Sequence, residues 1–238
     1  MNIALIGYGK MGKVIEQIAI SRNHNIALII DLNNRDQLNV DSFKQIDVAI
    51  EFSAPDAVIN NLQKLATLGV PVVCGTTGWY EEAKQIEELF LENNNALLYT
   101  SNFSIGVNLF FKINTYVAQL LSSHSQYKVH LQETHHTQKK DAPSGTGLSL
   151  AQQILPFYPL KENIVNYKSA LETDLSIESF RIDPAPGTHD IHYESDEDII
   201  QISHIAKNRN GFALGAVLAA EYLCNKKGIF TMNDVLSL

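Results

Sequence analysis

The chain begins with MNIALIGYGKMG, residues 1–12, in which a short apolar run leads directly into a glycine-rich turn. The run Ile3–Ile6 has the length and composition of a buried strand, and Gly7, Gly9 and Gly12 complete the pattern G-x-G-x-x-G. The first glycine of such a turn permits a sharp bend, the second lets a pyrophosphate approach the backbone, and the third lets the helix pack closely on the strand. The stretch therefore predicts a dinucleotide-binding βα unit, with a tight turn that binds nothing as the alternative.

The whole turn is expected to contact the cofactor, through Gly7, Tyr8, Gly9, Lys10, Met11 and Gly12. Asp31 ends the second apolar run about 20 residues later, where a carboxylate can accept hydrogen bonds from a ribose diol. Leu32 follows it and no arginine stands directly beside it, which favours NADH over NADPH. Arg35 and Lys10 are close enough in sequence to weaken that preference.

The first hundred residues alternate short apolar runs with segments of helical periodicity. The runs are Ile3–Ile6, Ile26–Ile30, Val48–Ile50, Val70–Val73 and Ala96–Leu98. Between them apolar residues recur at helical spacing, for example at Met11, Val14, Ile15, Ile18 and Ala19. Strands buried on both faces that alternate with amphipathic helices predict right-handed βαβ crossovers and a parallel sheet.

The pattern changes after Ser104. A long apolar stretch, Ile105–Leu121, predicts one helix, and Tyr127–Glu133 alternates like a strand that is covered on one face. Further strands are predicted at Ser176–Ile182, His189–Glu194 and Asp198–Ile205, and a last helix, apolar on nearly every side, at about Gly211 to Asn225. We therefore expect an α/β protein with a Rossmann-like, parallel-sheet dinucleotide-binding domain of residues 1–106 and 209–238. A second, α+β domain of residues 107–208 is expected to bind the substrate.

The composition excludes several classes of protein. Of the 238 residues, 45% are hydrophobic and 18% are charged, which excludes a disordered chain, and the formal net charge of −8 disfavours nucleic-acid binding. The two cysteines, Cys74 and Cys224, form no CxxC pair, so neither a disulfide scaffold nor a structural zinc site is expected. The start resembles a strand rather than a signal peptide, and Phe212–Ala220 is too short to span a bilayer. We expect a cytoplasmic protein without nucleic-acid or membrane partners.

Two further turns follow predicted strands. Gly75, Thr76 and Thr77 come after the fourth strand, and glycine and hydroxyl residues at the carboxyl end of a parallel strand commonly bind ligands. Thr100, Ser101, Asn102 and Phe103 follow the fifth strand and can frame a nicotinamide ring. The alternatives are an ordinary turn rich in capping residues for the first and a domain connection for the second.

The stretch ETHHTQKKDAPSGTG, residues 133–147, gathers two histidines and two lysines in an acidic chain. Ser144 is a predicted N-cap, and the N–H groups of Gly145 and Thr146 at the start of the following helix suit a carboxylate or phosphate. A histidine beside them can exchange a proton near neutral pH. The alternatives are a metal site, which lacks suitably spaced carboxylate or cysteine partners, a solvated lysine loop, and glycines that only form turns.

These residues resemble the 4-hydroxy-tetrahydrodipicolinate reductase family, also called dihydrodipicolinate reductase, of the bacterial lysine and diaminopimelate pathway. Its signature, E-[IV]-x-E-x-H-x-x-x-K-x-D-x-P-S-G-T-A, is matched by Glu133, His135, Lys139, Asp141, Pro143, Ser144, Gly145 and Thr146. The resemblance extends to the two glycine turns, to Asn102–Asn108 and to Arg209. The sequence departs from the family at His130, Leu131, Thr137 and Gly147, none of which is a proposed catalytic position.

The resemblance implies a reductase that transfers a hydride from NADH or NADPH to a cyclic imine with two carboxylates. It implies that His136, Lys139, Gly145 and Thr146 bind this substrate, and that the turns at residues 75–77 and 100–103 lie near the nicotinamide. His135 would be the general acid and Lys139 a fixed cation or proton donor, with no metal involved. The family implies a homotetramer formed through the sheet of the second domain. The alternatives are a dehydrogenase acting on another amino or imino diacid, and a dinucleotide sensor without activity.

Overall fold

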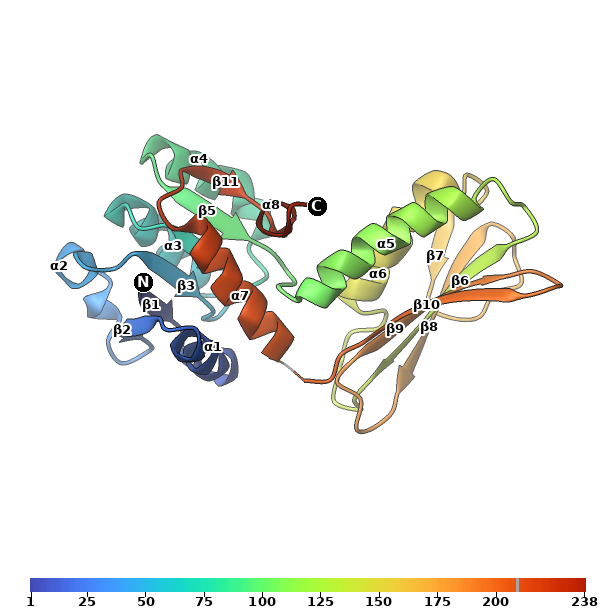
Figure 1. The fold of residues 1–238 in the computed structure, drawn as a ribbon, viewed down its shortest axis with the longest axis horizontal. Helices are drawn as coiled ribbons and strands as arrows, with labels where there is room; N and C mark the ends of the chain where they lie inside the picture. Colours follow the sequence, from blue (N-terminus) through green and yellow to red (C-terminus); the bar gives the residue numbers. More distant parts are fainter. Residues whose placement is uncertain (209) are drawn as a thin grey trace. The chain divides into compact units, whose positions relative to one another are not determined.

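The structure is a computed structural model that describes residues 1–208 and 210–238. The chain divides into two compact units, Met1–Asn108 with Asn210–Leu238, and Leu109–Arg209. Arg209, one of the residues that carry the family resemblance, lies outside the described residues. Each unit is built around its own sheet (Figure 1).

The first unit has a six-stranded parallel sheet in the order β11-β5-β4-β3-β1-β2. Its strands are β1 (Asn2–Ile6), β2 (Asn25–Ile30), β3 (Val48–Glu51), β4 (Val72–Cys74), β5 (Ala96–Tyr99) and β11 (Gly228–Phe230). Its helices are α1 (Lys10–Ser21), α2 (Val40–Phe43), α3 (Val58–Leu68), α4 (Ala83–Glu92), α7 (Asn210–Leu223) and α8 (Met232–Leu236). Short 3₁₀ turns occur at Arg35–Gln37 and Tyr80–Glu82.

Helices cover both faces of this sheet. Successive residues of β1 point to opposite sides: Ile3 and Leu5 pack with α1 and α7, whereas Ala4 and Ile6 pack with α3 and α4. Two cores therefore sandwich the strands, which explains why β3 and β4 are buried along their whole length. The expected α/β, Rossmann-like class is confirmed for this unit.

The last helix, α7, packs against α1 (Figure 1). The helix is apolar on nearly every side because it is buried on nearly every side. Residues inaccessible to solvent include Ala213, Ala216, Val217 and Ala220. Gly215 lets the helix approach the chain after β5, because a Cβ there would lie 1.8 Å from the carbonyl oxygen of Phe103.

One expectation about the strands is corrected, and three short elements are new. The run Ile26–Ile30 is not buried on both faces, because β2 lies at the edge of the sheet, where alternate residues remain exposed or half-exposed. The strands β7 and β11 and the helix α8 were not expected; β7 and β11 have three residues each, too few to show a period in the sequence.

The second unit has a mixed five-stranded sheet in the order β10-β9-β6-β8-β7. Its strands are β6 (Lys128–His135), β7 (Asn163–Val165), β8 (Asp174–Arg181), β9 (Thr188–Glu194) and β10 (Ile199–Ile205). β6 is antiparallel to β9 and parallel to β8. The helices α5 (Ile105–Leu121) and α6 (Gly145–Ile154) contribute to one core on one face of the sheet, and a 3₁₀ turn at Leu155–Phe157 follows α6.

The alternation along β6 decides where the polar residues of this unit point. Val129 and Leu131 face the core, and Glu133 and His135 continue the same row toward the carboxyl end of the strand. Both side chains are consequently buried, at 1% and 7% exposure. Of the helices in the described part of the chain, none is long and apolar enough to cross a membrane.

Candidate functional site

The glycine turn after β1 has two glycines that the fold requires and one that it does not. Gly7 adopts a φ of +91°, and a Cβ there would lie 2.2 Å from the carbonyl oxygen of Phe52. A Cβ on Gly12 would lie 2.4 Å from the carbonyl oxygen of Gly7. Around Gly9 there is nothing within 4 Å of such a Cβ. The open space at Gly9, at the N-terminus of α1, is a cradle that a pyrophosphate can enter.

The other residues of the turn are placed differently. The hydroxyl of Tyr8 donates a hydrogen bond to Glu16 on α1, so this side chain lies along the helix. Lys10 is exposed, whereas Met11 packs against the core. Any contact of Tyr8 and Met11 with a cofactor is therefore expected through the backbone.

Asp31 lies beside the glycine turn because β1 and β2 are paired in register up to their last residues. Ile6 pairs with Ile30, and the N–H of Gly7 donates to the carbonyl of Ile30 at 2.8 Å. The backbone of the exposed Asp31 is held by the side chain of Asn34, whose Oδ1 accepts its N–H at 2.8 Å. The structure thus brings a carboxylate to the same end of the sheet as the turn.

The turn at Gly75, Thr76 and Thr77 is tied to the end of β3. Thr76 Oγ1 accepts the N–H of Ser53 at 2.9 Å, and a Cβ on Gly75 would lie 2.1 Å from the ring of Phe52. Below it the fully buried carboxylate of Glu51 accepts hydrogen bonds from Ser53 Oγ and from the amide of Asn61. Glu51 was not predicted from the sequence, where its one signal is a carboxylate that directly follows the apolar run Val48–Ile50.

The segment after β5 is only partly accessible. Phe103 is 2% exposed and its ring lies 5.6 Å from that of Phe52, so its side chain belongs to the core. Thr100 Oγ1 accepts the N–H of Asn102 at 3.1 Å, and Ser101 is exposed. The polar residues of this segment, rather than the aromatic one, are accessible to a ligand.

In the second unit, Glu133 is the centre of a buried polar cluster. Its carboxylate accepts the N–H of Ser144 at 2.9 and 3.1 Å, the hydroxyl of Ser144 at 2.5 Å and that of Ser179 at 3.0 Å. Burial by itself would raise the pKa of Glu133, but these hydrogen bonds outweigh it and hold the pKa below its ordinary value. Glu133 is therefore a buried anion.

His135 ends β6 next to this anion. Its Nδ1 lies 3.9 Å from Glu133 Oε1, and its ring meets the edge of His189 with the centroids 5.1 Å apart. Burial lowers the pKa of His135 more than the attraction of Glu133 raises it, so the imidazole is neutral near pH 7. Its Nε2 faces Gly187, where an added Cβ would lie 3.3 Å away.

The turn that follows carries the cations. Lys139 Nζ lies 2.8 and 2.9 Å from the two oxygens of Asp141, and this hydrogen-bonded ion pair lowers the pKa of Asp141. The guanidinium of Arg181, on β8, donates to the carbonyls of Lys139 and Asp141 at 3.3 and 2.6 Å and so holds the turn. His136 is half-buried and Lys140 is exposed.

The predicted N-cap is confirmed. Ser144 is extended, with φ of −68° and ψ of 157°, and its hydroxyl accepts the N–H of Gly147 at 3.0 Å. Gly147, where the family signature has alanine, packs closely on the acidic centre, since a Cβ would lie 2.6 Å from Glu133 Oε2. Gly145 has open space around it, with nothing within 4 Å of an added Cβ.

No metal site was expected at Glu133 and His135, but the fold brings His189 close to both. One ligand atom from each of Glu133, His135 and His189 lies within 4.8 Å of the others. The carboxylate is nevertheless occupied by its three hydrogen-bond donor groups, and the guanidinium of Arg181 lies 3.7 Å from Glu133 Oε1. These neighbours saturate the carboxylate and place a positive charge beside it, so the donor set fits a metal ion poorly.

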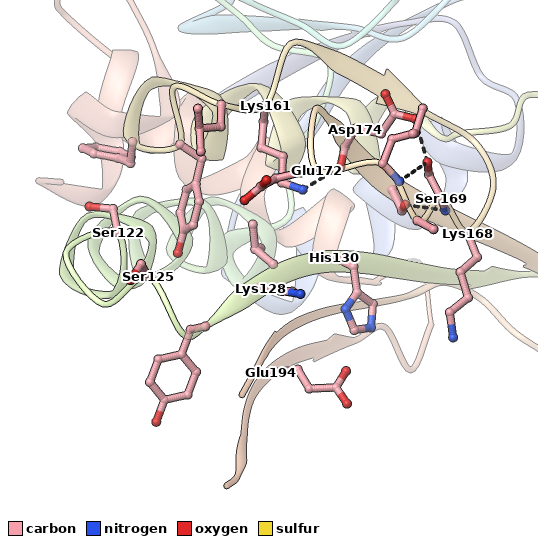
Figure 2. A pocket seen from close by; sticks show the side chains of 18 of the residues that line it. Ser122, Ser125, Lys128, His130, Lys161, Lys168, Ser169, Glu172, Asp174 and Glu194 are labelled. Carbon is pink, nitrogen blue, oxygen red and sulfur yellow. Dashed lines mark hydrogen bonds between the residues drawn. The ribbon is translucent and has the colours of Figure 1, made fainter. Parts of the chain in front are cut away.

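A cavity of about 870 Å³ lies elsewhere in the second unit (Figure 2). Its wall carries both signs of charge, with Lys128, Lys161 and Lys168 near Glu172 and Glu194. The residues of the predicted catalytic and substrate sites are not among those that line it.

Comparisons with known proteins cover the whole chain. The profile of the family described as dihydrodipicolinate reductase, N-terminus, matches residues 1–103, and that of its C-terminus matches residues 106–236. A protein of Christiangramia forsetii named 4-hydroxy-tetrahydrodipicolinate reductase is 46% identical, with 100% of this chain and 98% of the relative covered. A protein of the same name from Methanosarcina acetivorans is 36% identical, with both chains fully covered.

Solved structures share the fold. The dipicolinate-bound dihydrodipicolinate reductase from Paenisporosarcina sp. TG-14 has a TM-score of 0.79 at 24% identity, over 98% of both chains. The amine dehydrogenase from Mycobacterium smegmatis has a TM-score of 0.61 at 11% identity, over 98% of this chain and 95% of that one. At these identities the likeness establishes the two-domain architecture.

Proposed function

The chain belongs to the dihydrodipicolinate reductase family, and from this premise we propose that it reduces the cyclic imine derived from 4-hydroxy-tetrahydrodipicolinate to tetrahydrodipicolinate. The reaction is an NAD(P)H-dependent reduction in lysine and diaminopimelate biosynthesis. The observation that carries the assignment is the coincidence of a glycine cradle in one unit with a histidine–lysine turn at a helix N-terminus in the other.

The first unit fits a reduced nicotinamide dinucleotide. The cradle at Gly9 and the start of α1 receive the pyrophosphate, while Asp31 binds the ribose. The turns at residues 75–77 and 100–103 hold the nicotinamide end, since they follow β4 and β5 at the same edge of the sheet. When bound, the cofactor supplies the hydride.

NADH is proposed as the preferred cofactor. The carboxylate of Asp31 would repel the 2′-phosphate of NADPH, and the exposed Leu32 beside it supplies no compensating charge. Arg35, in the following 3₁₀ turn, is the cation nearest in sequence that can moderate this preference.

The second unit binds the two carboxylates of the substrate. His136 and Lys139 supply side chains, and Gly145 and Thr146 supply backbone N–H groups at the start of α6. Because the chain has a net charge of −8, this local set of donors, rather than the overall field, must attract the dianion.

His135 is proposed as the proton donor. The buried imidazole is neutral in the free protein, and two carboxylates placed beside it favour its protonated form, so substrate binding itself charges the acid. Lys139 stabilises the negative charge that develops toward the ring nitrogen and the neighbouring carbon, or donates the proton.

Assembly as a homotetramer is proposed to use the face of the second sheet opposite α5 and α6. Polar side chains cover this face, including His130 and His192, which stack with centroids 4.8 Å apart. The edge strand β10 exposes Ile199 and Ile205 at 57% and 66%. An exposed apolar edge strand is typical of a surface that another chain covers. Sedimentation of the protein and of an Ile205→Lys variant tests this, with a smaller species expected for the variant.

The function is tested by the initial rate of NADH and NADPH oxidation with the freshly generated cyclic substrate. We expect turnover, with a higher rate for NADH, and its near loss in His135→Ala with NADH affinity retained. Turnover of a different amino or imino diacid only would identify another dehydrogenase, and NADH binding with no turnover of any such acid would identify a sensor.

A further inference from the structure

The hydroxyl of Ser144 stands between two residues of the second sheet. Its Oγ lies 2.5 Å from Glu133 Oε2, 3.2 Å from His189 Nε2 and 3.0 Å from the backbone N of Gly147. A hydroxyl offers one donor and two acceptor positions, so three partners satisfy it completely.

The direction of each of these bonds follows from the partners. The carboxylate of Glu133 is ionised and only accepts, so it receives the single proton of the hydroxyl. The N–H of Gly147 only donates. The remaining position on Ser144 Oγ is an acceptor, and it must be filled by a proton on His189 Nε2.

His189 is therefore a neutral histidine with its proton on Nε2. Burial, and to a lesser extent the neighbouring His135, lowers the pKa of His189 to about 4, so it remains neutral at physiological pH. His189 is buried, with 6% of the residue exposed to solvent. It is a fixed donor rather than a proton carrier.

Glu133 and His189 are paired directly across β6 and β9. This register places an acceptor and a donor next to each other, 3.8 Å apart and both within hydrogen-bond reach of Ser144 Oγ. The same carboxylate also accepts the backbone N–H of Ser144. The residue that precedes α6 is thereby attached to the sheet through both its backbone and its side chain.

We propose that Glu133 and His189 are positioning residues that hold Ser144, and through it the first N–H groups of α6, in the place that binds a substrate carboxylate. The inference deepens the proposed function and rests on it. The backbone N–H and the hydroxyl of Ser144 both bond to Glu133 on β6, so the anion is proposed to meet the start of α6 at the next residues, Gly145 and Thr146. A site that is rigid before binding loses less conformational entropy when the ligand arrives.

Two substitutions of His189 separate the position of its hydrogen-bond donor from the effect of replacing the imidazole ring. In His189→Gln the amide nitrogen reaches the place of Nε2 and keeps the donor to Ser144, whereas in His189→Asn the shorter side chain places its amide near the position of Nδ1. Binding of pyridine-2,6-dicarboxylate, a stable dicarboxylate probe, and of NADH is measured by calorimetry. The KM and kcat for the cyclic imine complete the set.

We expect the Asn variant to weaken dicarboxylate binding and raise the substrate KM about five- to tenfold, the size of one lost hydrogen bond, with a smaller change in kcat. The Gln variant should stay within about twofold of the wild type. NADH affinity should be unchanged in both.

A double-mutant cycle shows whether His189 acts through Ser144. In a Ser144→Ala background the Asn substitution should have no further effect on dicarboxylate binding, because the group that His189 holds is gone. If the Asn variant does not fold, His189→Leu, which removes the donor and keeps most of the bulk, takes its place in the same cycle.

Equal dicarboxylate affinity in the Asn variant and wild type would overturn the inference, as would additive effects in the cycle or an equal loss of NADH affinity. A loss confined to kcat would assign His189 to the chemistry instead. Failure of the wild type itself to bind the probe or to turn over the imine would refute the proposed function, which is a distinct result.

Discussion

The two regions that are proposed to bind anions in this protein are built on opposite principles. The glycine turn after β1 works because side chains are missing: Gly9 leaves open space, and Gly7 and Gly12 permit contacts that a Cβ would prevent. The turn at Ser144 is held by side chains from three strands: Glu133 and His189 bond to Ser144, and Ser179 bonds in turn to Glu133. The first is a property of the backbone, and the second is a property of a hydrogen-bonded network.

Because the two regions are built separately, a substitution in the second unit that lowers kcat/KM should leave NADH affinity unchanged. Lys139→Ala should lower kcat/KM for the cyclic imine about 100- to 1000-fold, because it removes a fixed charge from the transition state. NADH affinity should stay the same. Lys140→Ala, which removes the exposed neighbouring lysine, is the matched control and should change kcat/KM less than about threefold. Equal losses in the two variants would show that only the overall charge of the turn matters.

The glycine turn can be separated into its structural and its binding positions. Gly7→Ala should lower the free energy of unfolding by about 3 kcal/mol or more, because it combines a left-handed φ with a Cβ 2.2 Å from a carbonyl oxygen. Gly9→Ala should change it by less than about 0.5 kcal/mol and weaken NADH binding about tenfold instead. Urea unfolding and fluorescence titration with NADH measure the two quantities. Similar stability losses in both would contradict the assignment of Gly9 to the ligand.

The network of the second unit should be sensitive to acid. The folded-state pKa of His189, about 4, lies below the value of about 6.5 in the unfolded chain, so the unfolded state binds the proton first as the pH falls. This contribution to the free energy of unfolding is present above about pH 6.5 and is lost as the pH falls toward 4. At pH 5 the loss amounts to about 2 kcal/mol. Urea unfolding at pH 7.5 and pH 5 should show a smaller difference for His189→Gln than for the wild type. An identical difference would mean that His189 is protonated in the folded protein.

The smallest effect is expected on the cofactor preference, measured as the ratio of NADPH to NADH activity. Asp31→Ser should raise the ratio of NADPH to NADH activity about tenfold, because it removes the charge that repels the 2′-phosphate. Stability should be unaffected, since the side chain is exposed and its backbone is held by Asn34. An unchanged ratio would place the discrimination elsewhere, with Arg35 as the next residue to test.

Much of the fold was predictable because the signals are local. The central strands are continuous apolar runs, and the amphipathic helices between them repeat every three to four residues. The edge strand β2 was assigned to the interior because its run Ile26–Ile30 looks the same whether a strand has one neighbour or two. Three-residue strands such as β7 carry too little pattern to be recognised.

The candidate site was predictable only in part. His135, Lys139 and Ser144 lie within one short stretch, so one motif contains them. Arg181 and His189 come from β8 and β9, and nothing in their immediate sequence marks them as neighbours of that motif.

The sequence by itself determined the parallel-sheet unit, the glycine turn and the family, because periodicity, backbone conformation and a long motif are all properties of residues close together in the chain. The tertiary structure alone decided which groups His189 contacts and what holds the start of α6. Hydrogen bonds act over about 3 Å, and only the pairing of β6 with β9 brings Glu133 and His189 within that range of one hydroxyl.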